Sequence, residues 1–278
     1  MKKNLLLLLP LFFILASCNL FSSFGKKVSF GESEVYYKGD GVTEADAKRL
    51  GDFLVEQEFF DKETPKSVQI TNDGKDYLVH FVVDKKKVTS AARLNWWKYQ
   101  YDISKDVFKG KPVRIILADD QLKDIEIMDP VARYEAGKSA FYYDNSQIKK
   151  SDVKKLEDFF TEIKLMGDDK ETDVFYQKEN GSPVVRLVVN PKKITDELLP
   201  VFSYWQQLMR EKVFDGAKAK LVLTSTKYED MDSLPNLTAE QRQTFENEAK
   251  QTTDNTEAAM DSTTTQTAPP GALRLPHN

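Results

Sequence analysis

The sequence predicts an α+β protein built from two tandem domains that arose by internal duplication. Sliding the chain along itself aligns residues 36–117 with residues 142–223 without a gap. Each stretch alternates strand-like and helix-like hydrophobic patterns, and each is long enough to bury a modest core of its own. We expect the two domains at residues 28–127 and 133–232.

Identities across the repeat are spread along its whole length. They include Tyr36-Tyr37 with Tyr142-Tyr143, Val82-Val83 with Val188-Val189, Val107-Phe108 with Val213-Phe214, and Gly110 with Gly216. Agreement this widely distributed at one constant offset indicates a duplication rather than chance.

The first copy has the element order βαββαβ. A strand over residues 34–38 precedes a helix that begins with the capping pair Thr43 and Asp46. Two strands follow, joined by a tight turn at Asp73-Gly74. A second helix leads to the last strand, residues 113–117. The apolar stripe of that helix comprises Ala92, Trp96, Tyr99, Ile103 and Val107.

The second copy repeats these elements with one departure, because Pro200 is expected to kink its second helix or to delay the start of that helix. The order βαββαβ matches the split-βαβ, ferredoxin-like arrangement of one sheet with two helices on one face. Residues 235–278 are predicted to form a polar, mostly disordered tail. A short polar helix capped by Thr238 is expected within it, over residues 238–250.

The N-terminal residues 1–17 have the order of an export signal. Lys2 and Lys3 form a positive segment, and residues 5–15 form an apolar run that ends in small residues. This run is shorter than the roughly 20 residues of a membrane-spanning helix. We therefore expect a signal peptide rather than a permanent membrane span.

Leu15-Ala16-Ser17-Cys18 resembles the lipobox of bacterial lipoproteins. The resemblance implies lipid on Cys18, cleavage before it, and a lipidated tether over residues 18–27. The alternative is an ordinary secretory signal with a chance cysteine. Cys18 is the only cysteine of the chain, so no internal disulfide forms. Asn19 after it favours the outer over the inner membrane, if sorting follows the enteric pattern.

The repeated unit also resembles an uncharacterised bacterial module. Its marks are Val42-Thr43-Glu44-Ala45, Leu50-Gly51, Phe59-Phe60-Asp61, Val68-Gln69-Ile70 and Asp106-Val107-Phe108. The second copy departs from this pattern with Glu157 in place of the glycine. The resemblance implies no activity.

Residues suited to catalysis or metal binding are scarce. His80 is expected as an outward-facing strand residue, and His277 lies in the predicted tail. With Cys18 lipidated, we expect no Cys–His or Ser–His–Asp arrangement, no metal site and no cofactor. The segment Gly137-Lys138-Ser139 lacks the upstream glycine of a phosphate-binding loop. Two acidic pairs lack the alternating oxygen ligands of a calcium loop, namely Asp119-Asp120 and Asp168-Asp169.

Aromatic residues are the remaining binding candidates. One tyrosine of each strand pair should be buried and the other exposed on the open sheet face. Trp97 follows Trp96, so on a helix its side chain is rotated by about 100° away from the apolar stripe that contains Trp96. The candidate binding residues are Tyr36, Tyr37, Tyr142, Tyr143 and Trp97.

The net charge of −4 argues against nucleic acid as a partner. The favoured hypothesis is a membrane-anchored envelope lipoprotein that acts as a non-enzymatic interaction or structural module. Its partners are membrane lipid, through Cys18, and an envelope protein. A small-ligand or carbohydrate-binding lipoprotein is the alternative, and a carboxylate-dependent hydrolase is a third reading.

Overall fold

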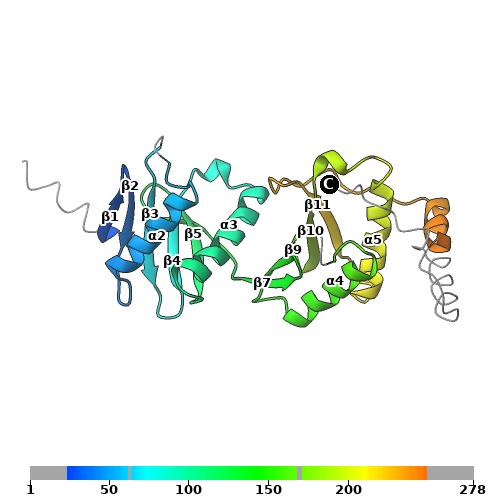
Figure 1. Cartoon of the computed structure of the whole chain (residues 1–278), viewed down its shortest axis with the longest axis horizontal. Helices are drawn as coiled ribbons and strands as arrows, with labels where there is room; N and C mark the ends of the chain where they lie inside the picture. The colour runs from blue at the N-terminus through cyan, green and yellow to red at the C-terminus, as the bar shows by residue number, and fades with distance from the viewer. Residues whose placement is uncertain (1–23, 62–63, 168–170, 249–278) are drawn as a thin grey trace, which may run out of the picture. The chain divides into compact units, whose positions relative to one another are not determined.

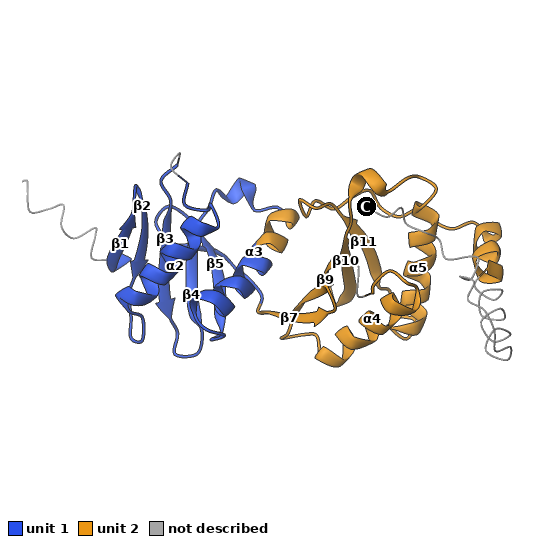
Figure 2. Ribbon diagram, viewed as in Figure 1, with its two compact units in different colours: residues 1–89, 96–129 blue, residues 90–95, 130–278 orange. Residues whose placement is uncertain are grey.

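The structure of the chain is a computed structural model (Figure 1) that describes residues 24–61, 64–167 and 171–248. The chain divides into two compact units (Figure 2), here called domain 1 and domain 2. Domain 1 comprises residues 1–89 and 96–129, and domain 2 comprises residues 90–95 and 130–278. The predicted signal peptide, Cys18 and the last part of the predicted tail lie outside the described residues.

Domain 1 contains one sheet whose strands lie side by side in sequence order. The strands are β1 (Lys26–Phe30), β2 (Ser33–Tyr37), β3 (Ser67–Asn72), β4 (Tyr77–Val82), β5 (Val113–Ala118) and β6 (Asp124–Ile127). The pairs β2–β3 and β4–β5 are parallel, and the other neighbouring pairs are antiparallel. The sheet is therefore mixed.

Helices connect the parallel strands of domain 1. Helix α2 (Glu44–Glu56) links β2 to β3, and α3 (Ser90–Asp102) continues into the π-helical turn η2 (Ile103–Val107) before β5. The predicted cap of α2 is confirmed, because Asp46 N donates to Thr43 Oγ1 at 3.2 Å and Thr43 N donates to Asp46 Oδ2 at 2.8 Å. The short 3-10 turn η1 (Lys85–Lys87) follows β4.

Domain 2 repeats this arrangement. Its strands are β7 (Val131–Ala136), β8 (Ser139–Asp144), β9 (Asp173–Glu179), β10 (Ser182–Val188) and β11 (Lys220–Thr224). Its helices are α4 (Lys150–Glu162), the 3-10 turn η3 (Pro191–Lys193) and α5 (Leu199–Lys212). Pro200 lies in the first turn of α5, so the proline delays the start of the helix instead of kinking it. In place of a sixth strand, Thr224 and Asp230 form a single antiparallel bridge.

The predicted α+β class, duplication and βαββαβ order are confirmed, but the predicted split-βαβ sheet order is wrong. In a split unit a further strand lies between the two parallel strands. Here β2 pairs directly with β3, and β4 pairs directly with β5. Domain 2 has the same order, with β8 paired directly with β9 and β10 paired directly with β11, so in both domains each helix joins two strands that are neighbours in the sheet. In domain 1 the central residues of β5 (Ile115, Ile116 and Leu117) are all buried. In a ferredoxin-like sheet β5 would be an edge, whereas β6 covers its outer side here.

Both helices of each domain lie on one face of its sheet; Figure 1 shows α2 and α3 together in front of the sheet of domain 1. In domain 2, buried residues of α4 and α5 share one core with residues of β8, β9, β10 and β11. Because β9 and β10 are antiparallel while the strand order continues in one direction, the two crossovers have opposite hands. One crossover therefore departs from the usual right-handed rule.

The chain after β11 continues along domain 2. Residues 239–248 form a helix, and the predicted cap at Thr238 is confirmed by a 3.1 Å bond from Gln241 N to Thr238 Oγ1. Phe245 stacks on Tyr204 of α5 with ring centres 5.3 Å apart. Within the described ranges, no helix combines the length and apolar character that crossing a membrane requires.

Candidate functional site

Tyr36 and Tyr142 occupy equivalent positions on the open face, the face of each sheet that carries no helix. In β8, Phe141 and Tyr143 on either side of Tyr142 belong to the core beneath the helices. Because side chains alternate along a strand, Tyr142 points to the opposite face of the sheet. Only 6% of Tyr36 and 2% of Tyr142 is exposed. The expectation that these tyrosines form an exposed contact surface is therefore wrong.

The chain itself covers these positions. In domain 1 the ring of Phe24 lies 5.7 Å from Tyr36, and Gln69 Nε2 donates to Phe24 O at 2.8 Å. In domain 2 Tyr142 stacks on Phe175 at 5.1 Å, and Tyr228 lies edge-on to Phe175 at 5.4 Å. Segments that precede and follow the repeated unit thus pack on the open faces, which the pattern within the strands could not show.

Tyr37 and Tyr143 occupy the helix side of their strands. Tyr143 is part of the buried core of domain 2, and burial raises the pKa of its hydroxyl. Tyr37 is partly exposed, and its hydroxyl donates to Glu44 Oε2 at 3.4 Å. Of the two residues, Tyr37 alone retains some exposure.

Trp97 is buried with 3% of its surface exposed, which corrects the prediction that it leaves the core. It lies one turn before Gln100, which is 1% exposed. The buried stripe of α3 thus runs through Trp97 and Gln100, whereas Trp96 and Tyr99 stay partly exposed. A glutamine occupies this stripe because its amide binds backbone of the neighbouring strand.

Gln100 and its counterpart Gln206 make the same contact in both domains. Ile115 N donates to Gln100 Oε1 at 2.8 Å, and Leu221 N donates to Gln206 Oε1 at 3.0 Å. Gln100 Nε2 also donates to Asp129 O at 2.9 Å. These repeated glutamines stabilise the last parallel strand of each sheet.

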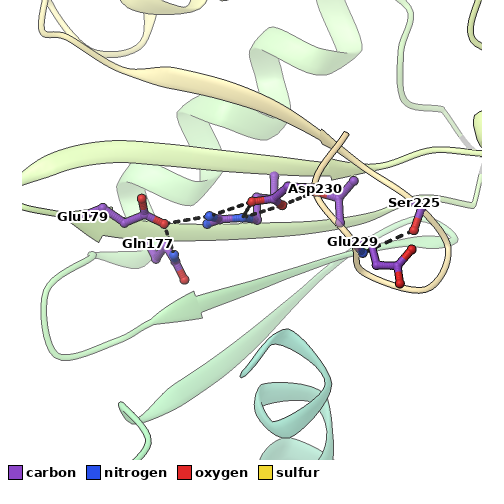
Figure 3. Close-up of polar contacts among 7 residues, drawn as sticks. Gln177, Glu179, Ser225, Glu229 and Asp230 are labelled. Carbon is purple, nitrogen blue, oxygen red and sulfur yellow. Dashed lines mark hydrogen bonds and ion pairs between the residues drawn. The ribbon is translucent and has the colours of Figure 1, made fainter. Parts of the chain in front are cut away.

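A polar cluster on the open face of domain 2 includes Arg186, and Figure 3 labels its partners Glu179 and Asp230 together with Gln177. Arg186 Nε lies 3.0 Å from Asp230 Oδ1, and its Nη2 lies 2.8 Å from Glu179 Oε1. Gln177 Nε2 donates to the same Glu179 oxygen at 2.6 Å, and Thr224 Oγ1 donates to Asp230 Oδ1 at 3.2 Å. The guanidinium therefore joins β10 to β9 and to the segment after β11.

His80 occupies the position of Arg186 in domain 1, and Asp124 occupies that of Asp230. His80 Nδ1 lies 3.3 Å from Asp124 Oδ1 without the alignment of a hydrogen bond. His80 Nε2 lies 3.1 Å from Thr71 Oγ1. The histidine lies on the open, helix-free face, as expected for an outward-facing strand position, but only 8% of it is exposed. The strands on either side and Asp124 enclose the ring.

Burial and charge act differently on the two basic residues. Burial lowers the pKa of His80, and the nearby Asp124 carboxylate offsets only part of this effect. Burial also disfavours the charged form of Arg186, yet the bonds from Asp230 and Glu179 raise the pKa of Arg186 overall. Arg186 remains a permanent cation, whereas burial favours the neutral form of His80.

We call these two arrangements clasps. The clasp of domain 1 consists of His80 and β6, and that of domain 2 consists of Arg186 and residues 225–231. Each binds a late segment of its domain to the open face through an aspartate, Asp124 or Asp230. Such an arrangement fixes chain segments; the two carboxylates already neutralise Arg186, which leaves it unsuited to capturing an anion.

Of the acidic pairs considered from the sequence, Asp119 has structural partners. Asp119 Oδ1 accepts from Gln121 N at 3.0 Å and from Lys123 N at 2.9 Å, as in a capped turn. Asp168 and Asp169 lie outside the described residues. Across the part of the chain that the structure describes, no three His, Cys, Asp or Glu side chains gather as a metal site requires.

Sequence reasoning missed the clasps and the repeated glutamines. Asp124 lies beyond residue 117, where the recognised repeat ends, although continuing the same offset places it on Asp230. Gln100 and Gln206 are identical residues at that offset, but their polarity removed them from the expected core. Identity at equivalent polar positions was the available signal.

Comparison with known proteins agrees with the repeated fold. No curated protein and no solved structure matches the chain. A family model, AF_1994_N, described as a family N-terminal domain, matches residues 27–129 and again residues 134–236. These matches cover both repeats and most of the chain. The chain therefore belongs to this family and carries its N-terminal domain twice.

Proposed function

We propose that this chain is a lipid-anchored protein of the bacterial cell envelope that acts as a non-enzymatic interaction module. The observation that carries the proposal is the lipobox-like segment Leu15-Ala16-Ser17-Cys18, which follows an export-like segment and contains the only cysteine. Lipid on one residue gives stable membrane binding when several acyl chains are attached. The absence of an aspartate after Cys18 favours the outer membrane.

The start of the described fold supports a short tether. Phe24 already packs on Tyr36, and its carbonyl accepts from Gln69. Phe24 lies six positions after Cys18, and six extended residues reach about 20 Å. Lipid on Cys18 would thus hold domain 1 close to the membrane surface.

The duplicated architecture supports an interaction role. Gln100 and Gln206, which the two copies share, bind the backbone of their own domain. The large apolar side chains exposed among the described residues are Val55 and Ile127, each 48% exposed. A partner would accordingly meet a mainly polar surface, as in many non-obligate complexes.

Crosslinking in intact cells, followed by affinity capture, tests this proposal. We expect the full-length protein to capture an envelope partner that Cys18→Ala no longer captures. Ser17→Ala is the matched control, because a small residue before the cysteine suits the lipobox and should preserve capture. If the full-length protein and both variants capture nothing, the interaction role is refuted.

Under the carbohydrate-binding alternative, one cluster of partly exposed aromatic side chains could contact a sugar. Tyr36, Tyr142, Tyr143 and Trp97 are buried and cannot serve as a sugar platform. Phe59, Trp96 and Tyr99 of domain 1 are partly exposed. Their ring centres are 5.9–6.3 Å apart. Thermal shift with envelope oligosaccharides would favour this alternative only if Trp96→Ala removes a shift that the unaltered protein shows.

A further inference from the structure

The two clasps hold equivalent segments with basic residues of different chemistry. His80 on β4 and Arg186 on β10 occupy the same position of the repeat, and each lies beside the aspartate of the segment that follows the last parallel strand. Arginine stays charged throughout the physiological range, whereas histidine changes charge near neutral pH. Equivalent positions of the two domains therefore carry a side chain that can lose its positive charge near neutral pH, His80, and one that cannot, Arg186.

The clasp of domain 2 is held by several contacts that do not depend on protonation near neutral pH. Arg186 binds both Asp230 and Glu179. Thr224 also donates to Asp230, and Tyr228 packs on Phe175. Backbone bonds from Ser225 N to Glu229 O at 2.9 Å and from Met231 N to Leu223 O at 2.8 Å close the segment. Several of these contacts would have to break before the segment could leave.

The clasp of domain 1 has comparable backbone bonds, with Asp119 N donating to Lys123 O at 2.9 Å and Met128 N donating to Ile115 O at 2.9 Å. It differs at the basic residue, because His80 Nδ1 makes no hydrogen bond to Asp124. Strand β6 has four residues, its pairing with β5 shifts register between Leu117 and Ala118, and Ile127 is 48% exposed. The Asp124 side chain is 49% exposed. A short, exposed element with few buried contacts belongs to the least stable part of a fold and opens locally.

The surroundings of His80 decide how this clasp responds to acid. Thr71 on β3 lies at Nε2, and Asp124 on β6 lies at Nδ1. Lys38, after β2, opposes a positive charge on the ring. Burial is the largest effect and also disfavours the charged ring, so the pKa of His80 is lower in the closed fold than in water.

We propose that the clasp of domain 1 is a proton-sensitive device that opens in mild acid, whereas the clasp of domain 2 stays closed. An opened segment exposes His80 to water, where the ring accepts a proton more readily than in the closed fold. Protons therefore bind the open state preferentially. The closed state is fully favoured above the ordinary pKa of histidine, and this preference is lost as the pH falls below about 6.5. The inference does not depend on the lipid anchor.

Amide hydrogen exchange of the full-length protein in detergent tests the proposal. After correction for intrinsic rates, protection of residues 124–127 should fall several-fold between about pH 7.5 and about pH 5.5. Ordinary carboxylates remain ionised over this window. Protection of residues 225–231 should change little. Equal pH dependence of both segments, or no dependence of the first, would overturn the proposal.

Reciprocal variants identify the histidine as the cause. His80→Arg should abolish the pH dependence of residues 124–127, and Arg186→His should confer it on residues 225–231. Should His80→Arg fail to fold, His80→Gln provides a neutral side chain that does not titrate. Retention of the unaltered pH dependence in His80→Gln would assign it to another group and refute the mechanism.

The titration of His80 provides an independent readout. The chain contains two histidines, His80 and His277, so His277→Ala assigns the imidazole signals in a magnetic resonance titration. We expect His80 to titrate at lower pH than free histidine. A midpoint at or above the ordinary value of about 6.5 would contradict the proposal.

Discussion

Replacing Gln100 with leucine tests whether the Gln100 side chain stabilises β5 through its hydrogen bond to Ile115 N. In the antiparallel register of β5 and β6, Ile115 N would donate to the carbonyl of Met128. That carbonyl instead accepts from Arg114 Nη2 at 3.2 Å, and Ile115 N donates to Gln100 Oε1 at 2.8 Å. Leucine preserves most of the volume of Gln100 and removes both amide atoms.

The expected loss follows from the groups that remain. An unsatisfied buried N–H of Ile115 costs about 1–3 kcal/mol, and the lost bond to Asp129 O contributes about 0.5–1.5 kcal/mol. The apolar leucine side chain offsets part of this cost. We expect Gln100→Leu to lower the unfolding free energy of domain 1 by about 2–3 kcal/mol.

Urea unfolding followed by tryptophan fluorescence measures this loss one domain at a time. Trp205→Phe leaves Trp96 and Trp97 as reporters of α3 in domain 1. Gln206→Leu is the matched control, measured in a chain that keeps Trp205 and carries phenylalanine in place of Trp96 and Trp97. Gln206 is partly exposed, and the loss should be about 1 kcal/mol in domain 2. A loss below about 0.5 kcal/mol for Gln100→Leu would refute the reasoning.

Three further substitutions test local features by equilibrium unfolding. Leu156→Ala removes a side chain of α4 that is 0% exposed, so domain 2 should lose about 2–5 kcal/mol while exposed Lys155→Ala changes little; equal effects would contradict the assigned core. Thr43→Ala removes the cap of α2 and should cost about 1 kcal/mol, and a neutral effect would count against the capping bonds. Gly51→Ala places a methyl group 2.0 Å from the ring of Phe30 and should cost about 1–2 kcal/mol. Phe30→Ala in the same chain removes the clash, so Gly51→Ala should cost less stability in that background; an unchanged cost would contradict the assigned contact.

The sequence allowed the repeat and its elements to be predicted because each element depends on local patterns. Helices α2 and α4 occupy equivalent residues, Glu44–Glu56 and Lys150–Glu162, as the constant offset requires. Strand order depends on which strands meet, and alternation within a strand does not encode its neighbours. Strand β6 is short and largely exposed, so its pattern gave no signal that it covers β5.

The candidate site was less predictable for a related reason. The pattern within a single strand or helix indicates which residues share a face, whereas the burial of the candidate binding residues depends on segments outside those elements. Phe24 packs beside Tyr36 and Tyr228 covers Phe175, and both covering residues lie outside the expected strands. Trp97 was misassigned because buried Gln100 places polar and apolar residues on one stripe. Such tertiary effects override local preference.

Intact mass spectrometry of the protein purified from bacterial membranes tests whether Cys18 anchors this chain. We expect the purified chain to begin at Cys18 and to carry acyl chains on that residue. We expect Cys18→Ala to show neither the cleavage nor the added lipid mass. A chain that keeps residues 1–17, or one cleaved there with no added lipid mass, would contradict anchoring through Cys18.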